Sequence, residues 1–342
     1  LPPRGPSTAG PPGRPGPGPR PGLEGGERCA ARAHRGTPRA DQKGGGAFSR
    51  RPSDAPARRR PVFVRETAIG RMDGLVLGGT ASSVGKTVAT LAVSRALADA
   101  GVTPVAAKAG PDYIDPSHHA AALGRPSRTL DTWMQGVDGV RRNLYRATAT
   151  GQDIAGRGDD GEGDTVAVVE GMMGLYDGTA TSTAATAAAL DVPVVLVVDA
   201  TAGMQSVGAT ALGFREYAAH ADLPAEVRAS VDDPRVDVVG VIAQRAHAGR
   251  HADGIRRSLP EGISFLGHVP PAEALTVPDR HLGLQMGDEA PIPDDAIAEA
   301  AETIDGEAVA ATARTVAPPT QTTAGEAAGA DARDRAAGDD PP

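Results

Sequence analysis

A glycine-rich segment at residues 79–87 combines residue types that can bind a nucleotide. It reads GTASSVGKT. Such a loop, placed before a helix, presents backbone N–H groups to phosphate oxygens, while Lys86 can reach the outer phosphates and the Thr87 hydroxyl can ligate Mg²⁺. The strict motif has its first glycine at the position of Thr80, whereas here the glycine comes one residue earlier. A plain glycine turn is the alternative, but the lysine and threonine favour ATP binding. The residues predicted to contact the nucleotide here are Gly79, Ser82, Ser83, Val84, Gly85, Lys86, Thr87 and Val88.

Carboxylates beside a second lysine could position a metal ion and a phosphoryl group. Lys108 precedes Asp112 and Asp115, which are three residues apart. Oxygen ligands of this kind suit Mg²⁺ and phosphoryl transfer. An Asp-x-x-Asp segment with proline is also common in ordinary turns, so its spacing alone leaves both interpretations open. The lysine adds weight to the functional one, because residues 72–312 contain two lysines, Lys86 and Lys108, against 15 arginines.

A third segment ends a Val-rich run with an acidic residue and continues with glycines. It reads VVEGMMGLYDG and contains Glu170 and Asp177. A carboxylate that directly follows a buried strand near a phosphate-binding loop is a usual place for a metal-associated residue. The alternative, a solvated glutamate in a flexible loop, fits less well because Glu170 directly follows the apolar run. Asp199 also ends an apolar run, where a site residue and a helix N-cap are equally consistent.

Histidine and large apolar side chains near these motifs have less specific interpretations. His118 and His119 are adjacent and would point in different directions on a helix. We therefore interpret them, together with His281, as substrate-region or packing residues rather than as metal ligands. Trp133 and Met134 are expected in the core rather than at a ligand.

The elements that must position these motifs alternate between short apolar runs and longer alanine-rich stretches. The Val-rich runs are typical of strands buried on both faces, and residues 86–100 have apolar side chains at helical spacing. Strands alternating with helices predict a mostly parallel, doubly wound α/β sheet, in which ligands bind at the carboxyl ends of the strands. Each motif above follows a predicted strand. The predicted strands are residues 74–79, 103–109, 164–169, 192–199, 236–243 and 263–269.

Composition divides the chain into two ends and a body. Residues 1–71 hold 15 Lys and Arg against 5 Asp and Glu, whereas residues 72–312 hold 17 against 33. The first segment is rich in Pro, Gly and Arg without apolar periodicity, so we predict that it is disordered, as we do for residues 313–342. One interpretation of residues 1–71 is a basic arm for nucleic acid. We favour a mis-assigned start with the true one at Met72, and expect no nucleic-acid partner.

Cysteine use and hydropathy restrict the class further. The single cysteine, Cys29, lies outside the predicted folded body, which excludes an intrachain disulfide and a cysteine-based metal site. No apolar run reaches 18 residues, and the start of the chain lacks the apolar core of a signal peptide. We expect a soluble, cytoplasmic protein that does not bind a membrane.

Three stretches of the body together resemble the cobyrinate a,c-diamide synthases. They are KAGPDYIDPSHHAAALGRPSRTLDTWM at 108–134, the VVEGMMGLYDG segment, and VPDRHLGL at 277–284. The resemblance covers roughly residues 73–286 and implies a P-loop NTPase fold of the dethiobiotin-synthetase type. It also implies amidation of the a and c side-chain carboxylates of cobyrinic acid through acyl phosphates, with ATP and Mg²⁺ as cofactors.

The same resemblance implies roles for individual residues. Catalytic roles fall to Lys86, Asp112, Asp115, Glu170 and Asp177. Magnesium would be held by Thr87, Asp112 and Glu170, and the substrate would be contacted by Tyr113 and Ile114. Lys108 would bind phosphate, and Gln244 with Arg245 would recognise adenine, although relatives commonly carry Asn at the position of Gln244.

Members of this family usually continue into a glutaminase domain that supplies ammonia through a cysteine nucleophile. Residues 72–312 contain no cysteine, so they cannot supply that nucleophile. The predicted partners are cobyrinic acid and a missing or separate glutaminase domain, with free ammonia as another source and a homodimer as one option for assembly. We interpret this chain as a fragment or a frameshifted product.

Two other functions remain open on the sequence. One is a related ligase acting on another tetrapyrrole or on the dethiobiotin precursor, and the DYIDP-to-DTWM stretch argues against the latter. The other is a ParA- or MinD-like regulatory ATPase. Such proteins usually carry a second lysine early in the loop, where this chain has Thr80-Ala81-Ser82.

Overall fold

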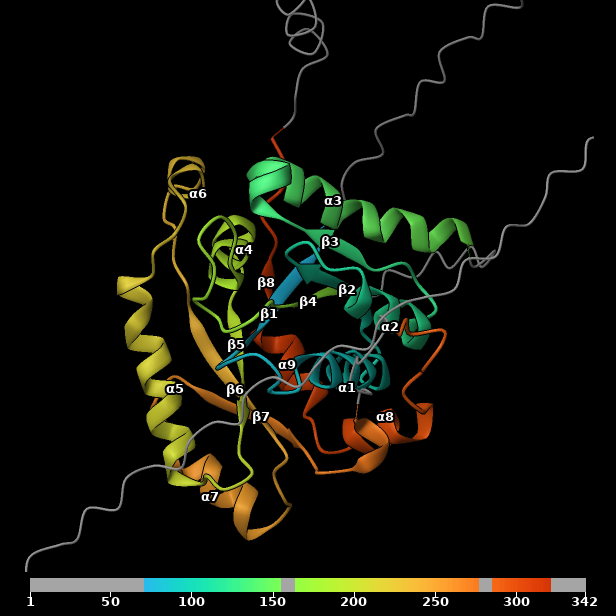
Figure 1. The fold of residues 1–342 in the computed structure, drawn as a ribbon, viewed down its shortest axis with the longest axis vertical. Coiled ribbons are helices and arrows are strands. Elements are labelled where there is room, and N and C mark those ends of the chain that lie inside the picture. The colour runs from blue at the N-terminus through green and yellow to red at the C-terminus, as the bar shows by residue number, and fades with distance from the viewer. Residues whose placement is uncertain (1–70, 155–163, 277–284, 321–342) are drawn as a thin grey trace, which may run out of the picture. The chain divides into compact units, whose positions relative to one another are not determined.

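A parallel sheet organises the described part of the chain (Figure 1). The computed structural model describes residues 71–154, 164–276 and 285–320, which belong to one compact unit. The strand order is β3-β2-β4-β1-β5-β6-β7, with parallel pairing between neighbours, while β8 pairs antiparallel with the start of β1. The strands are β1 Asp73–Gly79, β2 Thr103–Ala109, β3 Arg128–Leu130, β4 Thr165–Glu170, β5 Val194–Asp199, β6 Val238–Gln244, β7 Ser264–Val269 and β8 Arg314–Thr315.

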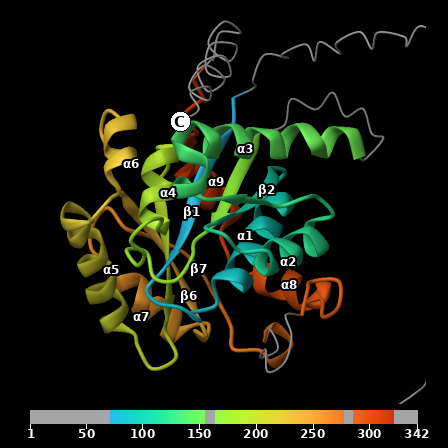
Figure 2. The ribbon, with the colours of Figure 1, turned by 45° about the horizontal axis from the view of Figure 1, so that its top comes forward.

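Helices cover both faces of this sheet. One buried cluster joins the sheet to α1, α8 and α9, and a second joins it to α3, α4, α5 and α6. Figures 1 and 2 both show α1 and α8 on the same side, away from α4. The helices are α1 Lys86–Asp99, α2 Ile114–Leu123, α3 Thr132–Ile154, α4 Thr183–Leu190, α5 Gln205–Tyr217, α6 Ala225–Ser230, α7 Arg250–Ser258, α8 Asp294–Ala301 and α9 Gly306–Thr312, with 3₁₀ turns η1 Ala218–His220 and η2 Glu273–Leu275.

The predicted doubly wound α/β class is confirmed. Strand β1 is central in the sheet. The chain first adds β2, β3 and β4 along one edge of β1 and then β5, β6 and β7 along its other edge. The predicted strands all occur, with ends that differ by at most two residues. The three strands that precede the predicted motifs, β1, β2 and β4, are nearly continuous runs of buried residues. This is expected where helices cover both faces of the sheet. The short edge strand β3 was not predicted.

The predicted end of the folded body, residue 312, is wrong. Beyond it, β8 pairs with β1, and the side chain of Val316 is fully buried. The Val316 amide donates to Met72 O over 2.8 Å, and the hydroxyl of Tyr145 donates to Val316 O over the same distance. The fold therefore includes at least residues 313–320. The disorder predicted for residues 1–70 and 321–342, and the role suggested for His281, lie outside the described residues.

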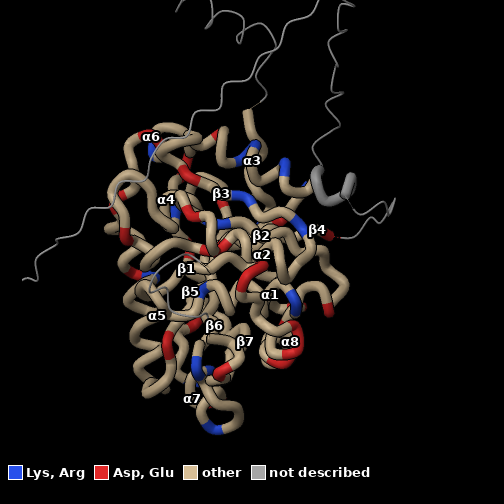
Figure 3. Tube along the Cα trace, turned by 45° about the vertical axis from the view of Figure 1, so that its right-hand side comes forward, with Lys and Arg blue, Asp and Glu red and all other residues tan. Residues whose placement is uncertain are grey.

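Charged side chains are unevenly distributed over the described surface. Figure 3 shows acidic residues gathered at α8, where Asp294 and Asp295 occupy the first turn. Negative charge there is favourable, because the N-terminus of a helix carries partial positive charge. Among the described helices, none has both the length and the apolar character required to cross a bilayer.

Candidate active site

The glycine-rich loop joins the carboxyl end of β1 to α1, as the sequence predicts. Gly85 adopts a φ of 91° immediately before the helix, in the left-handed region that favours glycine. A Cβ at this position would lie 2.9 Å from the side chain of Gln244. No side chain in the described part of the chain caps the start of α1. Its backbone N–H groups are thus available to an anion.

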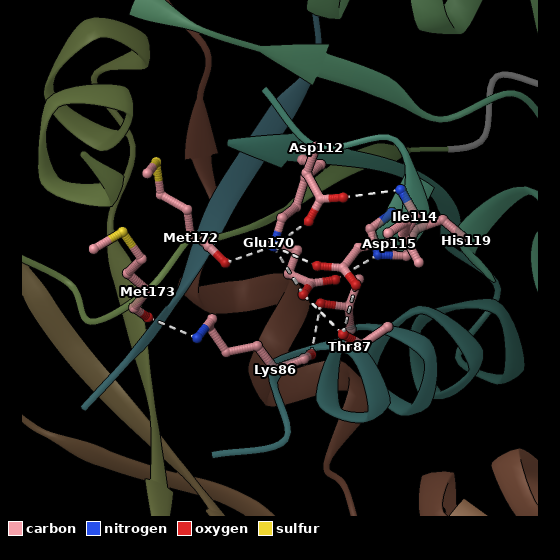
Figure 4. A network of polar contacts seen from close by, with 12 residues as sticks. Lys86, Thr87, Asp112, Ile114, Asp115, His119, Glu170, Met172 and Met173 are labelled. Carbon is pink, nitrogen blue, oxygen red and sulfur yellow. Dashed lines mark hydrogen bonds and ion pairs between the residues drawn. The ribbon is translucent and has the colours of Figure 1, made fainter. Parts of the chain in front are cut away.

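Lys86 is buried where this loop meets the loop that follows β4 (Figure 4). Its ammonium group donates to Ala81 O over 3.1 Å and to Met173 O over 2.6 Å. Burial lowers the pKa of Lys86, and the positive charge of Lys108 acts in the same direction. Because phosphate oxygens would favour the charged form more strongly than carbonyls do, the site is suited to a polyphosphate.

Lys108 lies at the end of β2 among three carboxylates. Its Nζ is 2.7 Å from Asp115 Oδ2, 3.1 Å from Glu170 Oε1 and 4.0 Å from Asp112 Oδ2. It also donates to Gly171 O over 2.9 Å. Burial lowers the pKa of Lys108, but Glu170 and Asp115 outweigh burial and leave that pKa raised. The charge on Lys108 is therefore retained and offsets the negative charge gathered at this point.

The hydroxyl of Thr87 faces two of these carboxylates. It donates to Glu170 Oε1 over 3.0 Å and lies 3.4 Å from Asp115 Oδ1. A hydroxyl with one or two carboxylates fits Mg²⁺, which takes its remaining ligands from water and substrate phosphates. The described residues contain no group of three or more His, Cys, Asp and Glu side chains arranged to hold a metal by themselves.

Asp112 lies at the rim of this group. Its Oδ1 accepts a hydrogen bond from the backbone N–H of Ile114 over 2.8 Å, which fixes the turn into α2. Burial raises the pKa of Asp112, and the negative charge of Asp115 adds to that effect. Asp115, rather than Asp112, is the aspartate beside Thr87. The predicted metal ligation by Asp112 stays a prediction.

His119, interpreted from the sequence as a substrate-region or packing residue, is bonded to a carboxylate of the site. Its Nε2 donates to Glu170 Oε2 over 2.6 Å, and its Nδ1 lies 3.0 Å from the Ser127 hydroxyl. Both His119 and Glu170 are buried. One signal could have placed His119 at the site, although not its pairing with Glu170, because residues four apart share a helix face and His119 follows Asp115 by four residues.

A cleft of about 1270 Å³ runs from these carboxylates along the P-loop to the ends of β6 and β7. Gln244 and Arg245 line its far part. The amide nitrogen of Gln244 donates to Gly85 O over 2.8 Å, so this buried side chain braces the P-loop. Arg245 pairs with Asp199, the two charged groups lying 2.7 Å apart. Their predicted contact with adenine is compatible with this place in the cleft and stays a prediction.

The remaining predicted residues differ in their exposure. Asp177 lies in the loop after β4, where its Oδ2 accepts from Gly174 N over 3.1 Å. Tyr113 is exposed, whereas Ile114 is buried, so the Ile114 side chain packs inside the described structure. The expectation that Trp133 and Met134 lie in the core is wrong, because both are among the most exposed large hydrophobic residues. Asp199 is bonded to Thr201 as well as to Arg245, and it does not cap a helix.

Residues 75–284 match the family model described as the CobQ/CobB/MinD/ParA nucleotide binding domain. The chain belongs to this family. The match begins within β1 and extends past β7, so it includes the P-loop and every strand end that lines the cleft. The description of the matched family assigns nucleotide binding to this region, and the individual residues predicted to bind the nucleotide stay predictions.

Curated relatives are similar over the same region. The cobyrinate a,c-diamide synthase of Halobacterium salinarum is 60% identical over 250 residues, which are 73% of this chain and 51% of the relative. That of Haloarcula marismortui is 57% identical over 248 residues, 72% of this chain and 50% of the relative. The hydrogenobyrinate a,c-diamide synthase of Stutzerimonas stutzeri is 36% identical over 236 residues, 67% of this chain and 48% of the relative. The chain spans about half the length of these relatives.

Proposed function

We propose that this chain carries the ATP-dependent part of a cobyrinate a,c-diamide synthase. The observation that carries the proposal is the convergence of Lys86, Lys108 and Glu170 with two aspartates in one cleft beside the P-loop. The names of the two relatives at 60% and 57% identity support the choice of substrate. The activity, the substrate and the partners of the whole protein are parts of this proposal.

The proposed reaction starts from a carboxylate of the substrate. Ammonia cannot convert this carboxylate directly into an amide, because the carboxylate oxygen is a poor leaving group. Attack of a substrate carboxylate oxygen on the γ-phosphorus breaks the bond to ADP and gives an acyl phosphate. Ammonia then attacks the carbonyl carbon, phosphate leaves, and the nitrogen loses a proton to give the amide. The protein contributes position and charge neutralisation to both steps.

The described residues divide this work. Lys86 would leave Met173 O and Ala81 O to contact the outer phosphates. Thr87 and Glu170, with Asp115 or Asp112, would hold Mg²⁺, which when bound neutralises charge on the phosphate oxygens. Lys108 keeps Glu170 and Asp115 in place and supplies positive charge beside the transferred group. Asp177, from the loop that also provides Met173 O, would face the incoming substrate.

The ammonia source belongs to the proposal as well. The family resemblance favours glutamine hydrolysis by a glutaminase domain or subunit, and the folded region offers no cysteine for that reaction. Free ammonia should therefore support turnover by this chain. Assembly into a homodimer stays a prediction.

A related corrinoid is the main alternative substrate, because the Stutzerimonas relative is named for hydrogenobyrinate. A ParA- or MinD-like ATPase shares the matched family, but the names of the relatives at highest identity favour a synthetase. Each alternative predicts a different dependence of ATP hydrolysis on the corrinoid.

The test is ammonia-dependent ADP release by the full chain, with Mg²⁺ and with cobyrinic acid, hydrogenobyrinic acid or neither. We expect ADP release to require a corrinoid, and the corrinoid to gain one or two amides by mass. The Lys86→Ala variant should lose at least about 100-fold in turnover, the scale of removing one preorganised charge-stabilising donor. ATP hydrolysis that is equal with and without either acid, and no amide product, would refute the proposal.

A further inference from the structure

Four exposed hydrophobic side chains lie in the segments that follow three neighbouring strands, with Trp133 and Met134 in the first turn of α3. Tyr113 is 76% exposed, Trp133 67%, Met134 69% and Met173 45%. They follow β2, β3 and β4, which are adjacent in the sheet, and they come from the edge that carries the catalytic carboxylates. The chain is poor in aromatic residues, with one Trp in total, and that Trp is left in solvent at this edge. Large apolar side chains exposed at one edge of a sheet suit a binding surface where they lie close enough to form a patch.

Hydrogen bonds bring these loops together. Gly110 N, at the end of β2 and in the lining of the cleft, donates to Leu130 O over 2.8 Å. Two residues further along, the hydroxyl of Thr132 lies 3.0 Å from that of Thr181, in the loop after β4. Residues next to Trp133 in the chain are thus hydrogen-bonded to both segments that contribute carboxylates to the site, the one after β2 and the one after β4.

The turn that presents Trp133 is tightly anchored. The buried carboxylate of Asp131 accepts from the backbone N–H of Trp133 over 2.9 Å and from that of Met134 over 3.3 Å. Asp131 O accepts from Gln135 N over 2.9 Å, and Gly136 then breaks the helical path with a φ of 64°. A fixed backbone keeps both residues at the same place in the fold, so little backbone freedom is lost when a ligand covers them.

Tyr113 joins this surface from inside the catalytic turn. It stands between Asp112 and Asp115 in sequence, and the hydrogen bond from Ile114 N to Asp112 fixes the turn around it. A ligand lying on Tyr113 would therefore place its edge near the phosphoryl site. The body of the chain carries a large excess of acidic residues, which repel carboxylates. A polycarboxylate ligand is therefore better held through an apolar contact with its ring.

We infer that Trp133, Tyr113 and Met134 form a contact surface for the apolar face of a tetrapyrrole ring. This surface, which we call the Trp133 platform, rests on the proposed function and specifies how its substrate is held. Planar aromatic side chains stack on an extended ring and leave the carboxylates at its rim free. The ring then lies on the Trp133 platform while one rim carboxylate reaches the γ-phosphate between Lys86 and Asp115.

The chain offers a direct probe of this inference, because Trp133 is its only tryptophan. Titration of the full chain with cobyrinic acid should quench and shift the tryptophan emission with saturation, after correction for corrin absorbance with free N-acetyltryptophanamide. Equilibrium dialysis should show that Trp133→Ala binds the corrinoid about tenfold more weakly, or about 1.4 kcal/mol. Trp133→Phe should stay within about threefold of the wild type, since it keeps an aromatic face.

Leu212 provides the matched control, because it is an exposed hydrophobic residue on α5, a helix that contributes no residue to the Trp133 platform. Leu212→Ala should leave corrinoid affinity unchanged. The binding of a fluorescent ATP analogue should be the same in all variants, which shows that they fold. In steady-state assays, Trp133→Ala should raise KM for the corrinoid with kcat largely retained.

The outcomes separate this inference from the proposed function. Wild-type chain that binds cobyrinic acid through Trp133 but never releases ADP would support the platform and refute the activity. ADP release with equal corrinoid affinity in wild type and Trp133→Ala would support the activity and overturn the platform. Absence of corrinoid binding, with Trp133→Ala altering the sedimentation of the chain, would also overturn it and identify a protein interface.

Discussion

His119 Nε2 lies 2.6 Å from Glu170 Oε2, and both side chains are buried. The other oxygen of Glu170 faces Thr87 and Lys108. The two oxygens therefore have separate tasks, because one is held from the α2 side while the other is directed into the cleft. His119 is thus a positioning residue, and it orients the carboxylate most deeply buried at the site.

Replacement of His119 by Ala should weaken both stability and turnover. It leaves a buried carboxylate oxygen without its donor, which costs roughly 1 to 3 kcal/mol in the free energy of unfolding. His119→Gln should restore part of both, since its terminal amide can donate in place of Nε2. Urea unfolding and corrinoid-dependent ADP release provide the measurements, with the exposed His220→Ala as control. Wild-type stability and turnover in His119→Ala would show that Glu170 needs no such support.

The ion pair between Asp115 and Lys108 predicts a loss of stability in acid. Burial raises the pKa of Asp115, but the charge of Lys108 and its hydrogen bond outweigh burial and hold that pKa well below its usual range. A carboxyl with a lower pKa in the folded chain stabilises the fold above its unfolded pKa, about 3.9. That stability is lost as the pH falls from there through the folded pKa.

In metal-free buffer, Asp115→Asn should therefore reduce the free energy of unfolding by roughly 1.5 to 3 kcal/mol at pH 7, and by less near pH 3. Asp112→Asn is the matched control. The pKa of Asp112 is shifted in the opposite direction, upward, so Asp112→Asn should leave the loss of stability in acid intact. Urea unfolding from pH 3 to 7 measures both. Parallel pH profiles for wild type and Asp115→Asn would contradict the assignment.

The central part of the fold was predictable because its strands are long and Val-rich. The unpredicted β3 has three residues at the edge of the sheet, too few to produce a pattern. The prediction that Trp133 is buried rested on its apolar character alone, and it is wrong because large apolar residues are usually but not always buried. The partner of His119 could not be predicted either, because it depends on how α2 packs beside β4. Local sequence specifies such packing only weakly.

A pair of glycines in α5 tests how closely that helix approaches α7. A Cβ on Gly208 would lie 2.0 Å from the backbone oxygen of Ser258, whereas a Cβ on Gly213 would meet nothing within 4 Å. Gly208→Ala should destabilise the protein by about 1 to 3 kcal/mol through overpacking. Gly213→Ala should stabilise it by about 0.5 to 1 kcal/mol, because alanine favours a helix interior. Equal melting temperatures for the two variants would contradict the close approach.

The segment after residue 312 packs against the folded body, although its composition gives no sign of this packing. Val316 is fully buried, and its backbone is hydrogen-bonded to Met72 and Tyr145. Ala317 N donates to Leu190 O over 3.0 Å, which ties the same segment to α4. These contacts join the end of the described chain to the start of β1, the strand that leads into the P-loop.

A chain ending after residue 320 should match the full chain in stability, whereas a chain ending after residue 312 should lose at least about 2 kcal/mol. Burial of one Val side chain contributes about 1.5 to 3 kcal/mol, and each hydrogen bond about 0.5 to 1.5 kcal/mol. Val316→Ala in the longer chain should lose part of this amount, which separates side-chain burial from backbone pairing. Urea unfolding of the three chains measures the difference. A chain ending after residue 312 that unfolds like the longer one would show that β8 and Val316 contribute nothing to holding β1.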